Sequence, residues 1–192
     1  HGRVDPLAQA KSYAAHGAAA LSVVVEPDFF HGDWELLAAC REASGLPAIA
    51  KDFVVSPAQL DAARAAGAAA ILLVAALYTP AELVRLAAAA RRRGLVPLVE
   101  THAPEEVAKL AGAEWELVGV NNRDLRTFEV DLARSLALAP ALPAGALRVA
   151  ESGIRSAAEV ARLAAGGFDA FLIGESLLLA PDPGALLAEL AG

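Results

Sequence analysis

Short apolar segments alternate with alanine-rich segments along almost the whole chain, and this alternation restricts the possible folds most strongly. The apolar segments are rich in valine, leucine and isoleucine, which suit buried strands, whereas alanine favours helix. Strands and helices that alternate at intervals of roughly 20–30 residues are typical of repeated βα units in a parallel sheet. The predicted strands are residues 20–25, 48–51, 70–74, 96–100, 117–120, 147–151 and 170–173.

A helical segment that begins at Asp5-Pro6 precedes the first strand and has no strand of its own. Seven βα units preceded by a lone helix predict a (β/α)8 TIM barrel whose first strand is missing. We therefore expect residues 1–192 to form a single TIM-barrel domain that is incomplete at its N-terminus. A chain that begins at His1 and contains no methionine agrees with a processed or truncated sequence. The alternative is an open doubly wound sheet, although no G-x-G-x-x-G follows the first strand.

Composition restricts the partners of the chain. The net charge of −7 argues against nucleic-acid binding by bulk attraction, but it allows an anionic small molecule in a locally positive pocket. No apolar run approaches the ~18 residues of a membrane span, so we expect no membrane partner. The single Cys40 excludes an internal disulfide framework and predicts a reducing, cytoplasmic location.

Charged residues stand at the carboxyl ends of three predicted strands. Lys51, Glu100 and Glu151 each follow an apolar residue two positions earlier, so each continues the face of its strand. In a barrel these ends face the mouth of the active site, where a lysine beside carboxylates suits general acid–base catalysis. The alternative is that Lys51 forms a salt bridge with Asp52 or Glu100 and only closes the top of the barrel.

The segment VGVNNRDL, residues 118–125, changes abruptly from an apolar strand to amides, a guanidinium and a carboxylate. Chemistry collects at such strand ends in parallel sheets, which makes Asn121 and Arg123 candidates for the site. The alternative for both residues is that they satisfy the carbonyl groups of the loop.

Two glycine turns follow the last two strands, at Ser152-Gly153 and at Gly174-Glu175. Glycine lets the backbone approach an anion closely, and a short helix after the last strand offers unpaired N–H groups. The phosphate site of many TIM barrels lies in the final two βα loops. We therefore expect a phosphate group at these turns.

The remaining candidates are aromatic residues and histidines. Phe30 and Phe53 each follow a strand end and could contact a flat ring of a substrate. His102 follows Glu100 closely and is interpreted as loop polarity, because no second imidazole stands at metal-ligand spacing. His16 and His31 also have no companion ligands, so we expect no metal site.

With these residues in view, the chain resembles indole-3-glycerol phosphate synthase, an enzyme family of tryptophan biosynthesis. The resemblance covers nearly all of the sequence, and the segments NNRDL and AESGI are its most specific parts. The matching segments are KDF at 51–53, LVE at 98–100, GVNNRDL at 119–125, VAESGI at 149–154 and FLIGESL at 171–177.

The resemblance implies a TIM barrel that closes the indole ring of 1-(2-carboxyphenylamino)-1-deoxyribulose 5-phosphate without cofactor or metal, releasing CO2 and water. Lys51 would be the general acid and Glu100 the general base. Asn121 would orient the substrate, and Glu151 and Ser152 would line the cavity. Further residues implied are Phe30, Phe53 and Leu72 for the aromatic ring, Arg123 for the substrate, and the backbone around Gly153, Gly174 and Glu175 for the phosphate. Association with other enzymes of the tryptophan pathway would also be expected.

The chain departs from the family at its beginning, where the E-x-K segment and the S-P-S loop of the first barrel strand are absent. By resemblance, these segments supply a catalytic glutamate, a lysine for the substrate carboxylate and a phosphate-binding serine. We expect a gap in the barrel wall and severely reduced activity if the molecule begins at His1, and a competent enzyme if the segments are present.

Two other functions remain open from the sequence. One is a phosphoribosylanthranilate isomerase-like barrel, whose chemistry uses a cysteine and an aspartate where this chain has lysine and glutamates. The other is a non-catalytic barrel fragment that binds phosphorylated ligands, which the missing first strand favours.

Overall fold

The structure is a computed structural model that describes residues 5–124 and 127–192. His1 and Leu125 of the NNRDL segment lie outside the described residues. The described chain forms one parallel sheet whose strands are hydrogen-bonded in the order of the sequence. Its strands are β1 (Leu21–Val24), β2 (Ala48–Lys51), β3 (Ala70–Val74), β4 (Val96–Thr101), β5 (Leu117–Asn121), β6 (Leu147–Glu151) and β7 (Ala170–Leu172).

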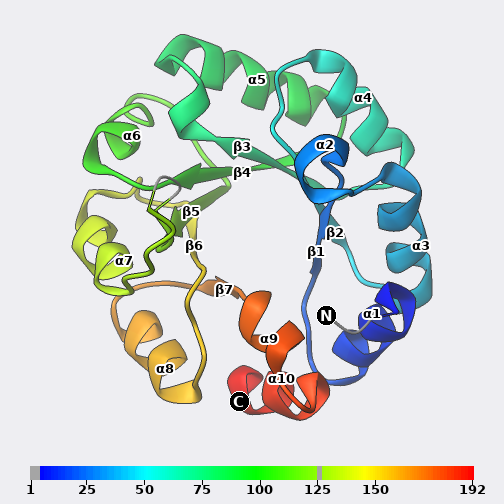
Figure 1. The fold of residues 1–192 in the computed structure, drawn as a ribbon. Coiled ribbons are helices and arrows are strands. Elements are labelled where there is room, and N and C mark those ends of the chain that lie inside the picture. Colours follow the sequence, from blue (N-terminus) through cyan, green and yellow to red (C-terminus); the bar gives the residue numbers. More distant parts are fainter. Residues whose placement is uncertain (1–4, 125–126) are drawn as a thin grey trace.

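Helices surround the curled sheet on its outer side, while the inner side faces a central axis (Figure 1). This arrangement and the sequential strand order are those of a TIM barrel, so the predicted fold class is confirmed and the doubly wound alternative is wrong. The outer helices are α1 (Pro6–Ala15), α3 (Trp34–Ser44), α4 (Pro57–Ala65), α5 (Pro80–Arg92), α6 (Pro104–Ala108), α7 (Ala133–Leu138), α8 (Ala157–Ala165) and α10 (Pro183–Ala191).

Four shorter elements complete the chain: α2 (Pro27–Phe30), α9 (Glu175–Leu179) and the 3-10 turns η1 (Ala75–Leu77) and η2 (Ala139–Ala141). Helix α2 directly follows β1 and carries Phe30 at its last position. No helix within the described ranges is long and apolar enough to cross a bilayer.

The sheet is open on one side, since no ladder joins β7 to β1 among the described residues. Helix α1 nevertheless packs against α3 and α10, so the outer layer of helices continues past this opening. Helix α1 therefore lies where the sequence predicted a helix ahead of the first predicted strand.

Helix starts follow the local sequence closely. In α4, α5 and α8 a Ser or Thr cap accepts a backbone N–H, while a Gln or Glu three residues later accepts the N–H of the cap. Each such cap typically stabilises a helix by about 1 kcal/mol. The three pairs are Ser56 with Gln59, Thr79 with Glu82, and Ser156 with Glu159.

Two apolar clusters hold the molecule together. The larger lies between the sheet and the helices and includes Leu37, Leu60, Ile71, Leu83 and Leu163. The smaller comes from alternate residues of β3, β4 and β6, namely Leu72, Val74, Leu98 and Val149. Because side chains alternate along a strand, the same faces of β4 and β6 continue into Glu100 and Glu151 at their carboxyl ends.

Candidate active site

The residues predicted for the site all line one cavity of about 510 Å³ at the carboxyl ends of the strands. The expected convergence of strand ends is therefore observed, although the role of each residue stays a prediction. The predicted residues that line the cavity are Lys51, Glu100, Asn121, Glu151, Phe30, Phe53, Leu72, Arg123, Ser152, Gly153, Gly174 and Glu175.

Lys51 and Glu100 form an ion pair inside this cavity. The Nζ atom of Lys51 lies 3.5 Å from Oε2 of Glu100, and the exposed fractions of the two side chains are 35% and 2%. The salt bridge between Lys51 and Glu100 that the sequence allowed is therefore present, but both residues also line the cavity. Asp52 instead accepts a hydrogen bond of 2.7 Å from Nε2 of Gln59. An ammonium beside a buried carboxylate can polarise a bound carbonyl group and hold a base in place.

Glu151 is buried next to this pair. Its pKa is raised well above the usual glutamate value, first by burial and then by the charge of Glu100 and a hydrogen bond to it, against the opposing charge of Lys51. Oε1 of Glu151 accepts no hydrogen bond from the described residues. Burial beside Glu100 therefore favours the neutral form of this carboxyl group.

Gly119 makes room for the Glu151 carboxyl group. It lies on the neighbouring strand β5, in register with Val149 of β6. A Cβ atom at this position would overlap Oε1 of Glu151. The glycine of the GVNNRDL segment therefore has a steric function that the sequence did not reveal.

The two amides of the NNRDL segment have different functions. Oδ1 of Asn121 accepts a 3.0 Å hydrogen bond from the backbone N–H of Arg123. Asn122 is buried, and its Nδ2 donates to the carbonyl groups of Glu151 at 2.9 Å and Ser152 at 3.3 Å. Its Oδ1 accepts from the hydroxyl of Ser135 at 2.7 Å. Asn122 thus joins β5, β6 and α7 below the site, a function that we had not assigned to it.

Arg123 forms an ion pair with Glu175 across the cavity, from the end of β5 to the start of α9. Its Nη1 also donates to the carbonyl oxygen of Phe128 at 3.4 Å. Both interpretations from the sequence are therefore represented: Arg123 lines the cavity and satisfies a loop carbonyl. The side chain of Glu175 is engaged with Arg123, whereas its predicted contact with phosphate is through the backbone.

The two glycine turns lie next to each other. Gly153 has a φ of +81°, and a Cβ atom there would overlap the side chain of Val130. The hydroxyl of Ser176 donates to the carbonyl oxygen of Ile154, which joins the turn after β6 to α9. Gly174 precedes α9 without a side-chain cap. Backbone N–H groups at such turns can receive an anion.

An aromatic pair lies at the opposite side of the mouth. The ring centroids of Phe30 and Phe53 are 6.3 Å apart, with the planes tilted by 44°. Phe30 belongs to α2, whose first backbone N–H groups, including those of Phe29 and Phe30, donate to the carboxylate of Glu26 at 2.7 and 3.1 Å. Glu26 thus caps α2, a function that becomes visible only in the structure.

The interpretation of His102 as loop polarity is wrong. His102 is buried, with Nε2 3.3 Å from Oε1 of Glu100 and Nδ1 3.3 Å from Oε2 of Glu106. Its position directly after β4, two residues beyond Glu100, was the available signal.

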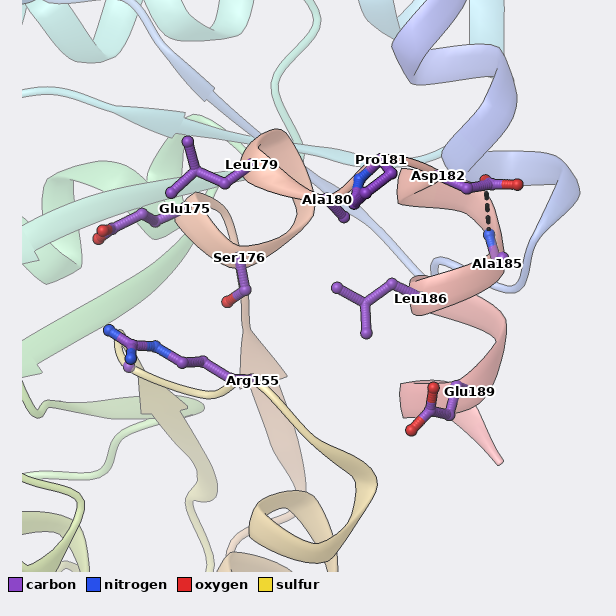
Figure 2. Close-up of a pocket in the computed structure, with 11 residues that line it drawn as sticks. Arg155, Glu175, Ser176, Leu179, Ala180, Pro181, Asp182, Ala185, Leu186 and Glu189 are labelled. Atoms are coloured by element: carbon purple, nitrogen blue, oxygen red, sulfur yellow. Dashed lines mark hydrogen bonds between the residues drawn. The ribbon is translucent and has the colours of Figure 1, made fainter.

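A second cavity of about 510 Å³ lies between α9, α10 and the loop after β6 (Figure 2). Figure 2 shows Leu186 extending from α10 into the space beside α9. This cavity shares Gly153, Glu175 and Ser176 with the first. Lys51, Glu100 and Glu151 line only the first cavity, so the groups suited to acid–base chemistry lie there.

Solved structures similar to this one share its fold. A crystal structure of 3-hexulose-6-phosphate synthase has a TM-score of 0.78 at 15% identity, covering 97% of this chain and 92% of that one. Orotidine 5'-phosphate decarboxylase from Pyrococcus horikoshii has a TM-score of 0.74 at 15% identity, covering 100% and 97%. At this identity the likeness shows the fold alone.

The sequence comparisons are more specific. The family described as indole-3-glycerol phosphate synthase matches residues 1–190. An indole-3-glycerol phosphate synthase from Rhodopirellula baltica is 48% identical over 178 residues, which cover 93% of this chain and 69% of the relative. The enzyme of that name from Koribacter versatilis is 46% identical over 188 residues, covering 98% of this chain and 72% of the relative. The chain belongs to the indole-3-glycerol phosphate synthase family.

Proposed function

We propose that the cavity around Lys51, Glu100 and Glu151 is the site at which this carboxy-lyase closes the indole ring of 1-(2-carboxyphenylamino)-1-deoxyribulose 5-phosphate. The protein belongs to tryptophan biosynthesis through its family. One observation supports the assignment of the site above all: an exposed ammonium, a carboxylate and a buried acid with a raised pKa meet in one cavity. A reaction with both acid and base steps requires one group that carries a proton to donate and another that can accept a proton.

In the first step, the ring carbon that bears the carboxylate attacks the ketone carbon of the sugar-derived chain, and a carbon–carbon bond forms. The ketone oxygen becomes negative, and Lys51 stabilises it and donates a proton. Loss of CO2 from the same ring carbon then leaves its bonding electrons in the ring system. The product of this step carries a hydroxyl group on the former ketone carbon.

In the second step, this hydroxyl group leaves as water while the neighbouring carbon loses a proton, which completes the aromatic indole. One proton must be supplied and one removed. Glu100 is the base that takes the proton, and the protonated carboxyl of Glu151 is the acid beside it. Asn121, at the mouth of the same cavity, orients the substrate.

The rest of the cavity fits the two ends of the substrate. Phe30, Phe53 and Leu72 offer apolar surface to the aromatic ring, and Arg123 offers a cation to the substrate. At the other end of the cavity are the two glycine turns that would receive the phosphate, formed by Gly153, Gly174 and Glu175. Ser152 lies beside them.

The test is the gain of indole fluorescence when the carboxyphenylamino substrate is added to the intact protein. We expect Lys51→Ala and Glu100→Gln each to lower kcat by about 10²- to 10⁴-fold, as for the loss of a placed acid or base. Lys11→Ala, on the outer surface of α1, is the matched control and should keep the parental kcat. A parental rate in either site variant would contradict the assignment.

We also infer a cytoplasmic location, which is supported by the single, unpaired Cys40. Association with other enzymes of the tryptophan pathway is a further proposal. Co-purification of the intact protein with those enzymes would test it.

A further inference from the structure

His102 lies directly behind the proposed base. It follows Glu100 by two residues at the end of β4, and 8% of its side chain is exposed. Nε2 lies 3.3 Å from Oε1 of Glu100, and Nδ1 lies 3.3 Å from Oε2 of Glu106 on α6. Nε2 makes no aligned hydrogen bond within the described part of the chain. A buried ring nitrogen this close to a carboxylate, with no other partner among the described residues, calls for a proton between them.

The count of protons follows from the chemistry of the three groups. An ionised carboxylate only accepts hydrogen bonds, and a neutral imidazole has one donor and one acceptor nitrogen. A neutral imidazole would therefore face one of the two carboxylates with a lone pair. A proton is therefore needed between Nε2 of His102 and Glu100, and another between Nδ1 of His102 and Glu106. Either the imidazole carries both protons, or it carries one and a carboxyl group carries the other.

Glu106 lies on the side of His102 that faces away from Glu100 and holds the imidazole ring in place. Burial acts to raise its pKa, but hydrogen bonds from the ring and the backbone N–H of His102 outweigh burial and hold the pKa below the usual value. The backbone N–H donates to Oε2 of Glu106 at 2.7 Å. On the other side, Nη1 of Arg134 on α7 donates to the carbonyl oxygen of His102 at 2.9 Å. The ring therefore has little freedom to turn away from Glu100.

The two oxygens of Glu100 thus have different neighbours. Oε1 faces His102, whereas Oε2 faces Lys51 and the cavity. The other charged group beside Glu100 is Glu151 on β6. His102 itself is not among the residues that line the cavity, so any effect on the substrate passes through Glu100.

We propose that His102, anchored by Glu106, is a positioning residue that holds a proton against Oε1 of Glu100, which keeps Oε2 ionised and directed at the substrate. The inference rests on the proposed function of Glu100 as the base. Loss of this charged contact should lower kcat by roughly 10- to 100-fold.

The first measurement is the pH profile of kcat and KM for His102→Leu, Glu106→Gln and the control His16→Gln in the intact protein. We expect His102→Leu to lower kcat while KM changes little, because His102 does not touch the substrate. The acidic limb of its kcat profile should move to higher pH, because the proton held against Oε1 of Glu100 no longer favours the ionised form of that carboxylate. Glu106→Gln keeps an acceptor for Nδ1 and should retain more kcat than His102→Leu.

A merely structural histidine would give a different result. It would lower the folded fraction, seen as a lower Tm, without moving the acidic limb. An active parent whose His102→Leu variant keeps the parental kcat and limb would overturn the inference. A parent that forms no indole product would instead overturn the proposed function.

The second measurement is independent of activity. The imidazole ¹⁵N signals of the chain's four histidines are assigned by single substitution, and the signals of His102 are compared in the parent and in Glu100→Gln. A change at Nε2 of His102 on this substitution supports the shared proton. Unchanged His102 signals, with or without activity in the parent, would overturn it.

Discussion

At the scale of single residues, the carboxyl group of Glu151 illustrates how burial can select a protonation state. Its side chain is 1% exposed and lies beside Glu100, and both features oppose ionisation. The nearby ammonium of Lys51 acts in the other direction but does not outweigh them. The same glutamate at an exposed strand end would be an ordinary carboxylate.

This raised pKa predicts how stability depends on pH. The unfolded chain loses the Glu151 proton near the ordinary value of 4.5, whereas the folded chain keeps it to higher pH. The folded state then binds more protons, so stability falls as the pH rises above about 4.5 toward the folded pKa. The substituted side chain of Glu151→Gln cannot ionise. As the pH rises from 5 to 8, the free energy of unfolding of this variant, measured by urea denaturation, should therefore increase relative to that of the parent.

Glu116→Gln is the control of opposite sign. A hydrogen bond from Arg91 lowers the pKa of Glu116, so its favourable contribution is present above the unfolded pKa and lost as the pH falls through the folded pKa. That variant should lose stability relative to the parent at pH 8. A pH-independent difference between Glu151→Gln and the parent would contradict the assignment of a buried proton.

At the scale of elements, the short helix α2 decides where the aromatic edge of the cavity lies. Burial acts to raise the pKa of Glu26, but the backbone N–H groups of α2 outweigh it and hold the pKa below the usual value. Gly32, which follows the helix, lies so close to β1 that a Cβ atom would overlap the carbonyl group of Val24. Both features keep α2 close to β1, so that Phe30 lies next to Phe53.

Removal of this cap should weaken substrate binding more than catalysis. In Glu26→Ala, the N–H groups of α2 lose their acceptor and Phe30 is no longer held over the cavity. An aromatic contact contributes about 0.5–1.5 kcal/mol, so KM should rise ~2- to ~10-fold with a smaller change in kcat.

Steady-state kinetics with Asp5→Ala as the control would check this prediction. Asp5 caps α1 at the outer surface, through N–H groups of Leu7 and Ala8. Its loss should affect stability and leave KM unchanged. An equal rise of KM in both variants would mean that α2 does not position the aromatic pair.

At the scale of the whole molecule, the sheet has a firm centre and two weaker edges. Every residue of β3 is buried, whereas β7 contains no buried residue and β1 alternates. Strands β1 and β7 are each paired on one side only within the described residues. Backbone groups at such edges open more readily than those in a paired, buried centre.

Hydrogen–deuterium exchange of the 192-residue chain should therefore be slowest in β3, β4 and β5 and fastest in β1 and β7. Mass spectrometry of peptic fragments would resolve these segments. Exchange in β7 as slow as in β4 would show that the opening between β7 and β1 does not weaken the sheet.

Much of the site was predictable because strand geometry is periodic. Lys51, Glu100 and Glu151 could be placed on inward faces from alternation alone, and they meet in one cavity. The motifs, not the fold, separated the synthase family from other enzymes of the same fold, because the fold is shared at 15% identity with enzymes of other names.

What the sequence determined by itself was local or periodic: seven parallel strands, helices with their caps, and the identity of the groups at the strand ends. Only the tertiary structure decided the neighbours of each group. His102 had to be interpreted differently because it is buried between Glu100 and Glu106. Glu151 had to be interpreted differently because it lies next to Glu100. The physical reason is that protonation and hydrogen bonding depend on distances between atoms of different strands and helices, which no pattern along a single segment contains.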